Sequence, residues 1–400
     1  MRFSMKKFLA AVCLAGAPAL LSGCASGGGR QASMKMAAYN NWNLARIQII
    51  CQLAHQQYET LEYKKCRRTL KQAFSAHYPY EPLYVLAAKV DIETGRLAAA
   101  CNRLKTASEI NAADPVPYYL LGIIYQRWQN NQAAHDYYKL AWQRKPASPL
   151  YMLAMVEMKI AMGQYASAQK LLKSKLMYFE ESAAVRSALG RLCMIRKNYA
   201  RACHYYRAAV LLSPNDANLK LDLAEAYYFN KNYQKAQRRL VRLRRAHAVP
   251  GRRTVLLLLG ECYLNLNRSI EAHDCFADLT AKYPRDAMAW TGLAKAALQI
   301  NDLIEARIAL RQALRVSPRD VHAWMLLALV QQRSGHWRKG MASLLKAHAI
   351  APNNSTVLCM LGISARQHGQ PAAARAYFQR AVKANPKDRW ARKLLGAAKE

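Results

Sequence analysis

Cysteine and histidine are the residues of this chain best suited to metal or redox chemistry, and their spacing limits what they can do. Cys203 stands next to His204, and Cys275 stands two residues after His273. A zinc site needs ligands that converge from tightly spaced pairs, whereas neighbouring residues on a helix point to different faces. We therefore expect no bound metal and no other cofactor.

The sequence also lacks the motifs of the common catalytic sites. It contains no G-x-x-x-x-G-K-[ST], no G-x-G-x-x-G, no G-x-S-x-G and no H-E-x-x-H. Its 24 acidic residues are scattered without an evident pair. These features predict a binding protein and not an enzyme.

A large excess of positive charge sets the class of partner. Lys and Arg number 60 against 24 Asp and Glu, which gives a net charge of +36. Phosphates, anionic lipid and acidic protein surfaces are therefore the candidate partners.

The first residues have the composition of a targeting segment, which we place at 1–23. Arg2, Lys6 and Lys7 precede an apolar run over 8–21 that is too short to span a bilayer. No later stretch of the sequence is apolar enough to predict a membrane-spanning helix.

The end of this segment, Leu-Ser-Gly-Cys at 21–24, resembles the lipobox of bacterial lipoproteins. The resemblance implies cleavage before Cys24 and acylation of its amine and thiol, which would anchor the chain firmly. Ala25 follows the cysteine, and by the same resemblance this implies the periplasmic face of the outer membrane of a Gram-negative bacterium. An ordinary secretory signal with an incidental cysteine is the alternative.

Residues 24–46 are expected to form the lipidated cysteine and a flexible tether. Three consecutive glycines at 27–29 and the polar residues that follow favour a mobile chain. Trp42 and Leu44 are expected to begin the folded part.

The rest of the sequence repeats with one period. Pro284, Pro318, Pro352 and Pro386 are each 34 residues apart, and 34 residues is the period of the tetratricopeptide repeat. The resemblance to that family covers 47–388, with two extra residues at 251–252. We divide it into ten repeats and a capping helix at 389–400: 47–80, 81–114, 115–148, 149–182, 183–216, 217–250, 253–286, 287–320, 321–354 and 355–388.

Each repeat carries the small and large residues that such packing requires. If the proline is counted as position 32, position 8 is mostly Gly or Ala, position 20 is almost always small, and position 24 is large, as in Gly190, Ala202 and Tyr206. Small residues let two helices approach, and proline ends the second helix. The resemblance therefore implies an all-α fold, a right-handed superhelical solenoid.

In this family the first helix of each repeat lines a concave groove through positions 2, 5, 9 and 12. Those positions carry an apolar strip with alternating charges, which suits an extended peptide or an amphipathic helix. The alternative is that these residues pack and pair between repeats. The predicted groove residues are Tyr119, Leu153, Glu157, Arg191, Glu225, Tyr228, Glu261 and Lys295.

A second predicted surface is the densest run of arginines in the chain. It suits lipid phosphates or an acidic protein, and an ordinary solvated face is the alternative. An exported protein seldom meets nucleic acid, and no base-stacking motif is present, so we expect no nucleic-acid partner. The run comprises Arg238, Arg239, Arg242, Arg244, Arg245, Arg252 and Arg253.

The eight cysteines of the repeats leave two readings open. Cys193 and Cys203 fall on facing helices of one repeat and are the best candidates for a disulfide, since an oxidising compartment permits one. The alternative is that the cysteines are small buried thiols at tight packing positions, as at Cys66, where an alanine is expected.

Taken together, these features predict a membrane-anchored scaffold that binds proteins of the cell envelope. Resemblance to the repeat lipoproteins of type IV pilus and tight-adherence systems implies a role in assembling or docking a pilus or secretin. An adaptor for peptidoglycan hydrolases or for exopolysaccharide export is the alternative.

Overall fold

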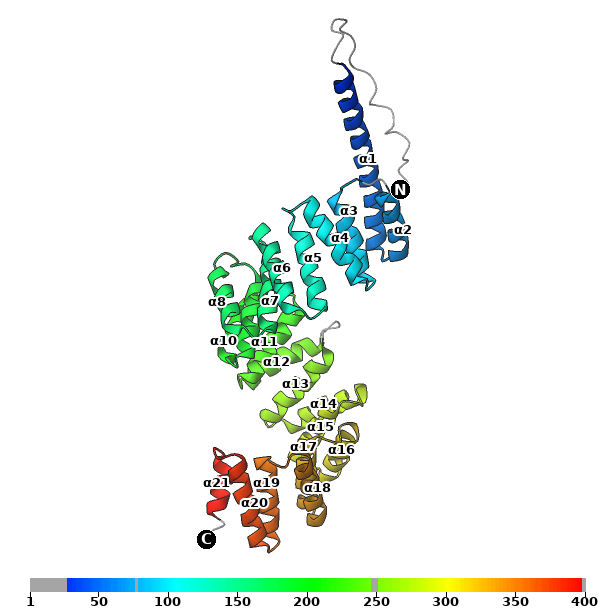
Figure 1. The fold of residues 1–400 in the computed structure, drawn as a ribbon. Helices are drawn as coiled ribbons and strands as arrows, with labels where there is room; N and C mark the ends of the chain where they lie inside the picture. The colour runs from blue at the N-terminus through cyan, green and yellow to red at the C-terminus, as the bar shows by residue number, and fades with distance from the viewer. Residues whose placement is uncertain (1–26, 76–77, 246–250, 398–400) are drawn as a thin grey trace. The chain divides into compact units, whose positions relative to one another are not determined.

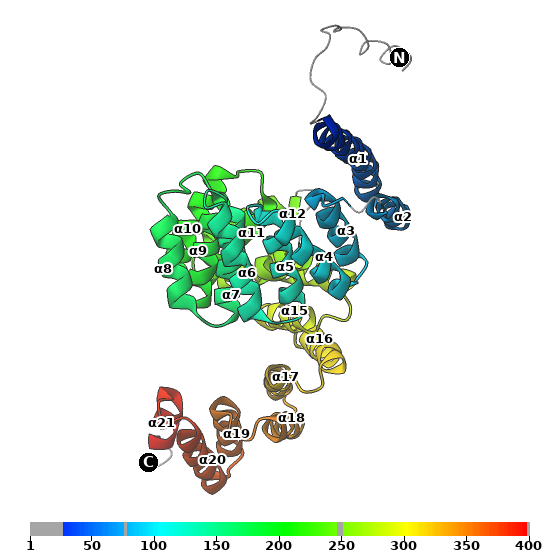
Figure 2. The same cartoon turned by 45° about the horizontal axis from the view of Figure 1, so that its top comes forward.

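The computed structural model describes residues 27–75, 78–245 and 251–397. Within these ranges the chain folds as successive helices and contains no strand. Within each unit, Figures 1 and 2 show helix pairs that lie side by side, such as α5 with α6 and α15 with α16. The all-α fold of tandem helix pairs that the sequence predicts is therefore confirmed.

The chain divides into two compact units, one up to Met158 and one from Lys159. The helices that begin in the first unit are α1 Gly27–Glu59, α2 Tyr63–Phe74, α3 Glu81–Glu93, α4 Leu97–Ile110, α5 Pro115–Arg127, α6 Asn131–Arg144 and α7 Pro149–Ala161, whose last residues belong to the second. The second unit continues with α8 Tyr165–Lys175, α9 Ala183–Ile195, α10 Tyr199–Leu212, α11 Ala217–Phe229, α12 Tyr233–Arg245, α13 Arg252–Asn265, α14 Ser269–Lys282, α15 Ala287–Gln299, α16 Leu303–Val316, α17 Val321–Arg333, α18 Trp337–Ile350, α19 Ser355–Gln367, α20 Pro371–Ala384 and α21 Arg389–Gly396.

Aspartate caps mark the start of many of the odd-numbered helices. At α11 the Asp216 carboxylate accepts hydrogen bonds from the backbone N–H of Asn218 at 2.8 Å and of Leu219 at 3.2 Å. Such a cap satisfies donors that the helix itself leaves open and stabilises it by about 1 kcal/mol. Side-chain caps of the same kind are made by Asp114, Asp286, Asp320 and Asp388.

Small residues packed against one large side chain hold each helix pair together. Gly260 of α13 and Ala272 of α14 are buried beside Phe276, which is itself fully buried. A Cβ atom added at Gly260 would lie 2.6 Å from the Phe276 ring, and one at Gly292 of α15 would also overlap that ring. The same side chain therefore packs within its own helix pair and against the next one.

Residues 27–46 belong to the stretch that the sequence predicts to be a flexible tether, and they are helical in the structure. Helix α1 begins at Gly27 and continues through the predicted tether to Glu59. No proline interrupts this stretch, and its Ala, Met, Gln and Arg residues favour helix. Burial begins only at Asn43 and Ile47, so the side chains from 34 to 42 are exposed although the backbone is helical.

The two extra residues at 251–252 form the start of a helix. Gly251 has a left-handed backbone with φ of 68°, a conformation that glycine adopts without strain. Helix α13 begins at the following residue, Arg252. At the other end of the chain, α21 packs on α19 and α20 through the fully buried Ala391 and the partly buried Leu394.

We expect Gly260→Ala to destabilise the second unit by about 1–3 kcal/mol, the usual range for overpacking a close-packed core. The added methyl group would overlap the Phe276 ring, which is fully buried and also lies against Gly292 of the next helix pair. The midpoint of urea unfolding measures this effect. Gly396→Ala is the matched control, because a Cβ there meets no atom within 4 Å. A Gly260→Ala chain as stable as the wild type would contradict this account of the packing.

Candidate protein-binding surfaces

The predicted groove residues of the first unit lie on α5 and α7. The ring of Tyr119 lies 5.6 Å from that of Tyr138 on α6 and 5.3 Å from that of Tyr151 on α7. Burial raises the pKa of the Tyr119 phenol. This side chain therefore packs between neighbouring helix pairs, whereas Leu153 and Glu157 lie one turn apart on α7 and are half-buried.

In the second unit the predicted groove residues lie on alternate helices, from α9 to α15. Arg191 on α9 is exposed, while Glu225 and Tyr228 on α11 are half-buried. Glu261 on α13 and Lys295 on α15 form an ion pair, with 3.2 Å between Oε1 and Nζ. At this point the alternative interpretation, pairing between repeats, describes what the structure contains.

An acidic side chain that the sequence analysis did not single out lies beside the predicted groove residues of α11. Asp222 is one helical turn before Glu225 and is half-buried. Burial, then the negative charges of Glu225 and Asp216, raises the pKa of Asp222 to about 6, and Arg191 opposes the shift. Burial also raises the pKa of Glu225. The spacing of three residues between Asp222 and Glu225 was the sequence signal that could have indicated this acidic pair.

Tyr228 is held in an aromatic cluster. Its ring lies 5.3 Å from that of Phe229 and 5.7 Å from that of Tyr233 on α12. Burial, followed by the negative charge of Glu261, raises the pKa of the Tyr228 phenol to about 12. The group is therefore neutral at physiological pH and able to donate a hydrogen bond to a ligand.

The predicted basic patch is partly engaged within the chain. Arg253 pairs with Asp286 at 2.5 Å, Arg244 donates to the Cys275 sulfur at 3.5 Å, and Arg239 lies over a tyrosine ring. The remaining four are exposed, and within the described residues no carboxylate pairs with them. These four are Arg238, Arg242, Arg245 and Arg252.

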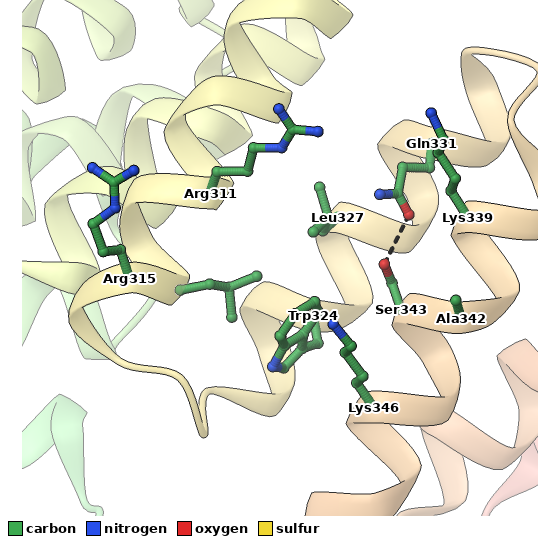
Figure 3. A pocket seen from close by; sticks show the side chains of 10 residues that line it. Arg311, Arg315, Trp324, Leu327, Gln331, Lys339, Ala342, Ser343 and Lys346 are labelled. Atoms are coloured by element: carbon green, nitrogen blue, oxygen red, sulfur yellow. Dashed lines mark hydrogen bonds between the residues drawn. The ribbon is translucent and has the colours of Figure 1, made fainter.

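A second basic surface, which the sequence analysis missed, lies between α16, α17 and α18. It is a cleft of about 460 Å³ with Leu314 and Leu327 among its lining residues. Figure 3 shows Arg311 on one side of the cleft and Lys339 on the other, with Trp324 below them. The cationic residues of this basic cleft are Arg311, Arg315, Lys339 and Lys346.

Among the described residues, none that lines this basic cleft is acidic. Trp324 is fixed by a hydrogen bond from its indole N–H to the Pro318 carbonyl at 2.9 Å, and the Lys346 ammonium lies 4.7 Å from the ring centre. An apolar floor with a cationic rim suits an acidic segment that also carries an apolar side chain. The four-residue spacing of Arg311 and Arg315 was the only local signal, because the other residues come from separate helices.

The cysteines of the described chain are all buried free thiols. Cys193 and Cys203, the candidate disulfide pair, are separate thiols in the structure, and burial raises the pKa of each. The Cys66 thiol donates to the Ala54 carbonyl at 3.1 Å, and burial raises its pKa to about 11. These thiols fill tight positions, as the second interpretation predicts.

Among the described residues, no three His, Cys, Asp or Glu side chains gather in a way that could hold a metal ion. In the same part of the chain, no helix is both long and apolar enough to cross a bilayer. The predicted lipidation site, Cys24, and the targeting segment 1–23 lie outside the described residues.

Two protein-family models match parts of the chain. The C-terminal domain of cilia and flagella-associated protein 70 matches residues 215–400. The tetratricopeptide repeat matches residues 153–217. The predicted repeat family is therefore supported, and protein binding is the general role of its members.

A curated relative and two solved structures are similar to this chain. The BBSome complex member BBS4 homolog of Drosophila melanogaster is 24% identical over 230 residues, which span 57% of this chain but only 42% of the relative. The APC/C hetero-tetramer Cut9–Hcn1 has a TM-score of 0.47 at 12% identity and covers 93% of this chain and 95% of its own. A thermophilic repeat protein of Thermus thermophilus has a TM-score of 0.40 at 23% identity, over 46% of this chain and 98% of its own.

The raised pKa of Asp222 predicts that Asp222→Asn stabilises the second unit at pH 7. The folded chain holds the proton of the Asp222 carboxyl more tightly than the unfolded chain does. The stabilisation of the fold by this protonated carboxyl is therefore complete below about pH 4. It is lost as the pH rises through about 6. Because Asp222 keeps contact with solvent, we expect a gain of about 1 kcal/mol at pH 7.

Unfolding midpoints measured between pH 4 and pH 7 provide the test. The gain from Asp222→Asn should shrink toward zero at the acidic end. Glu181→Gln removes an exposed carboxylate of the same unit and should change little at either pH. Equal effects of Asp222→Asn at both ends of the range would contradict the predicted titration.

Proposed function

We propose that this chain of tetratricopeptide repeats is a lipid-anchored scaffold of the bacterial cell envelope, where it assists the assembly or docking of a machine such as a type IV pilus or a secretin. The match to the tetratricopeptide repeat family supports a role in binding proteins. The Leu-Ser-Gly-Cys sequence at 21–24 supports the anchor, with Cys24 as the acylated residue on the periplasmic face of the outer membrane.

The basic cleft between α16, α17 and α18 carries the proposal that the partner is acidic. Four cations surround an apolar floor, and none of the described lining residues is acidic. A partner that brings carboxylates and an apolar side chain would neutralise the rim and cover Leu314 and Leu327. The exposed arginines at 238, 242, 245 and 252 offer a second surface of the same sign in the same unit.

The predicted groove offers a separate contact for the partner. Arg191, Glu225 and Tyr228 place charges of both signs and a neutral phenol on α9 and α11. An extended peptide or amphipathic helix could use such alternating groups to set its register. The Glu261–Lys295 pair would have to open to contribute, so we assign it a smaller share of the binding.

The match to cilia and flagella-associated protein 70 over 215–400, together with the similarity to a BBSome subunit homolog, favours a second candidate function. In it the chain would be a repeat subunit of a ciliary assembly and would not be lipidated at Cys24. Metabolic labelling with an alkynyl palmitate separates the two candidates. Label that is lost in Cys24→Ala supports the envelope scaffold, and no label on the wild type contradicts the lipid anchor on which that scaffold rests.

We expect the double reversal Arg311→Glu and Lys339→Glu to weaken capture of the envelope partner about tenfold, because two rim charges would then repel an acidic segment. The measurement is a cross-linking pull-down from intact envelopes, quantified for pilus and secretin subunits at two salt concentrations. Wild-type capture should fall with salt, and that of the variant should fall less.

The control carries the same change of charge at exposed positions away from the cleft, Arg366→Glu and Lys383→Glu. Equal capture by the two double variants would refute the cleft as the docking surface. Recovery of peptidoglycan hydrolases or polysaccharide-export proteins in place of pilus and secretin subunits would favour the adaptor role. A parallel Cys24→Ala sample tests whether the anchor is needed for capture.

A further inference from the structure

One acidic side chain in the first unit occupies a position where the other repeats carry different residues. Asp91 lies on α3 at position 11 of its repeat, which is tyrosine in the family pattern and in Tyr125, Tyr227 and Tyr263 here. Its side chain is 1% exposed. A carboxylate that is removed from water to this extent requires charged partners.

Three arginines from different elements surround Asp91. Arg96, in the turn before α4, directs its guanidinium at Oδ1, with distances of 3.0 Å from Nη2 and 3.2 Å from Nε. Arg103 on α4 donates from Nη1 to Oδ2. Arg67 on α2 approaches only to 3.9 Å and donates instead to the Thr94 hydroxyl at 2.8 Å. Two arginines therefore occupy the carboxylate, and the third remains outside hydrogen-bond distance.

Positive charge at this arginine cluster exceeds negative charge. Lys71 lines the same cavity as Asp91 and the three arginines, so four cations face one carboxylate. Burial, followed by the charge of Arg96, lowers the pKa of Arg67, and burial followed by the charge of Arg67 lowers that of Arg103. The two lowered pKa values show that the guanidinium groups destabilise each other's charge, so an anion that enters would be bound favourably.

The cluster opens into a cavity of about 320 Å³. The Nε atom of Arg67 is buried and has no hydrogen-bond partner within the described residues. The rest of the wall is apolar, with Leu70 and Phe74 from α2 and Ala87 and Val90 from α3. The cavity wall therefore includes a guanidinium group with an unpaired N–H, beside space for an organic group.

We propose that this cavity binds a phosphate monoester, whose phosphate accepts hydrogen bonds from Arg67 and lies against Arg96 and Arg103. Guanidinium groups present two parallel donors that match the oxygen spacing of phosphate. The dianion would offset most of the excess positive charge, and the organic group would pack on Leu70 and Phe74. Asp91 orients two of the three arginines before the ligand arrives.

A purely structural ion network is the competing account, in which Asp91 links α3 to α4 and Arg67 is an ordinary surface cation. The two accounts differ at Arg67. A structural network predicts no saturable binding of phosphate, and a merely basic surface predicts that lysine replaces arginine without loss. The phosphate site requires the guanidinium at this position.

The test uses the full chain and measures binding by calorimetry and by the ligand-dependent shift of thermal unfolding. The probes are inorganic phosphate and phenyl phosphate, against chloride at equal ionic strength, with phenol as the uncharged control. We expect saturable binding of both phosphates, tighter for phenyl phosphate because of the apolar wall. Phenol should not bind.

Three variants decide the role of Arg67. Arg67→Gln should weaken phenyl phosphate binding about tenfold or more, the loss typical of a charge-assisted hydrogen bond. Arg67→Lys should not restore it fully. Arg68→Gln removes an adjacent exposed charge of α2 and is the matched control, which should bind nearly as the wild type does. Equal affinities of Arg67→Gln and Arg68→Gln, or no saturable binding in the wild type, would overturn the proposal.

The same chemistry occurs on free metabolites and on lipid headgroups, and a vesicle arm separates these sources. Phosphatidic acid carries a phosphate monoester, so vesicles that contain it are compared with phosphatidylcholine vesicles. Phosphatidic-acid binding that Arg67→Gln abolishes and Arg68→Gln spares assigns the site to a lipid headgroup. Binding of phenyl phosphate without such vesicle binding assigns it to a soluble phosphate ester.

Discussion

The fold depends on one steric constraint, the fit of small residues against one large buried side chain in each helix pair. Phe276 shows it most clearly, because Gly260 of its own pair and Gly292 of the next both lie against its ring. Only a residue without Cβ lets the helix backbones come this close. Since the same side chain serves two pairs, each repeat is stabilised by its neighbour, as expected for a solenoid.

Because of this constraint most apolar side chains are used in packing, and the polar side chains remain available for binding. Residues at the predicted groove positions divide between these roles. Tyr119 is packed among tyrosines, and Glu261 is paired with Lys295, so both are partly committed to the fold. Arg191 is exposed, and Glu225 and Tyr228 remain half-buried beside Asp222. Binding energy from this surface would therefore come from a few side chains.

The chain has a net charge of +36, and its cations gather in two places of different geometry. In the basic cleft of α16 to α18, the lining residues that the structure describes include four cations and no acidic side chain. Around Asp91 the cations are drawn together by a buried carboxylate and close one side of a cavity. The first arrangement suits a protein surface, whereas the second is more recessed and suits a small anion. The excess positive charge is thus concentrated in two arrangements of different geometry.

The sequence by itself determined the repeat architecture, because the period of 34 and the small residues at fixed positions recur within each repeat. Each repeat therefore contains the local pattern that specifies its own helix pair. It did not reveal that the expected tether is helical from Gly27 onward. The three glycines at 27–29 predict a flexible chain, whereas the residues after them favour helix. Only the tertiary structure decided which charges meet. Arg67, Asp91 and Arg103 come from three different helices, and Glu261 and Lys295 are one full repeat apart. Their contacts depend on how successive helix pairs stack, and that stacking is set by long-range packing that no local spacing records.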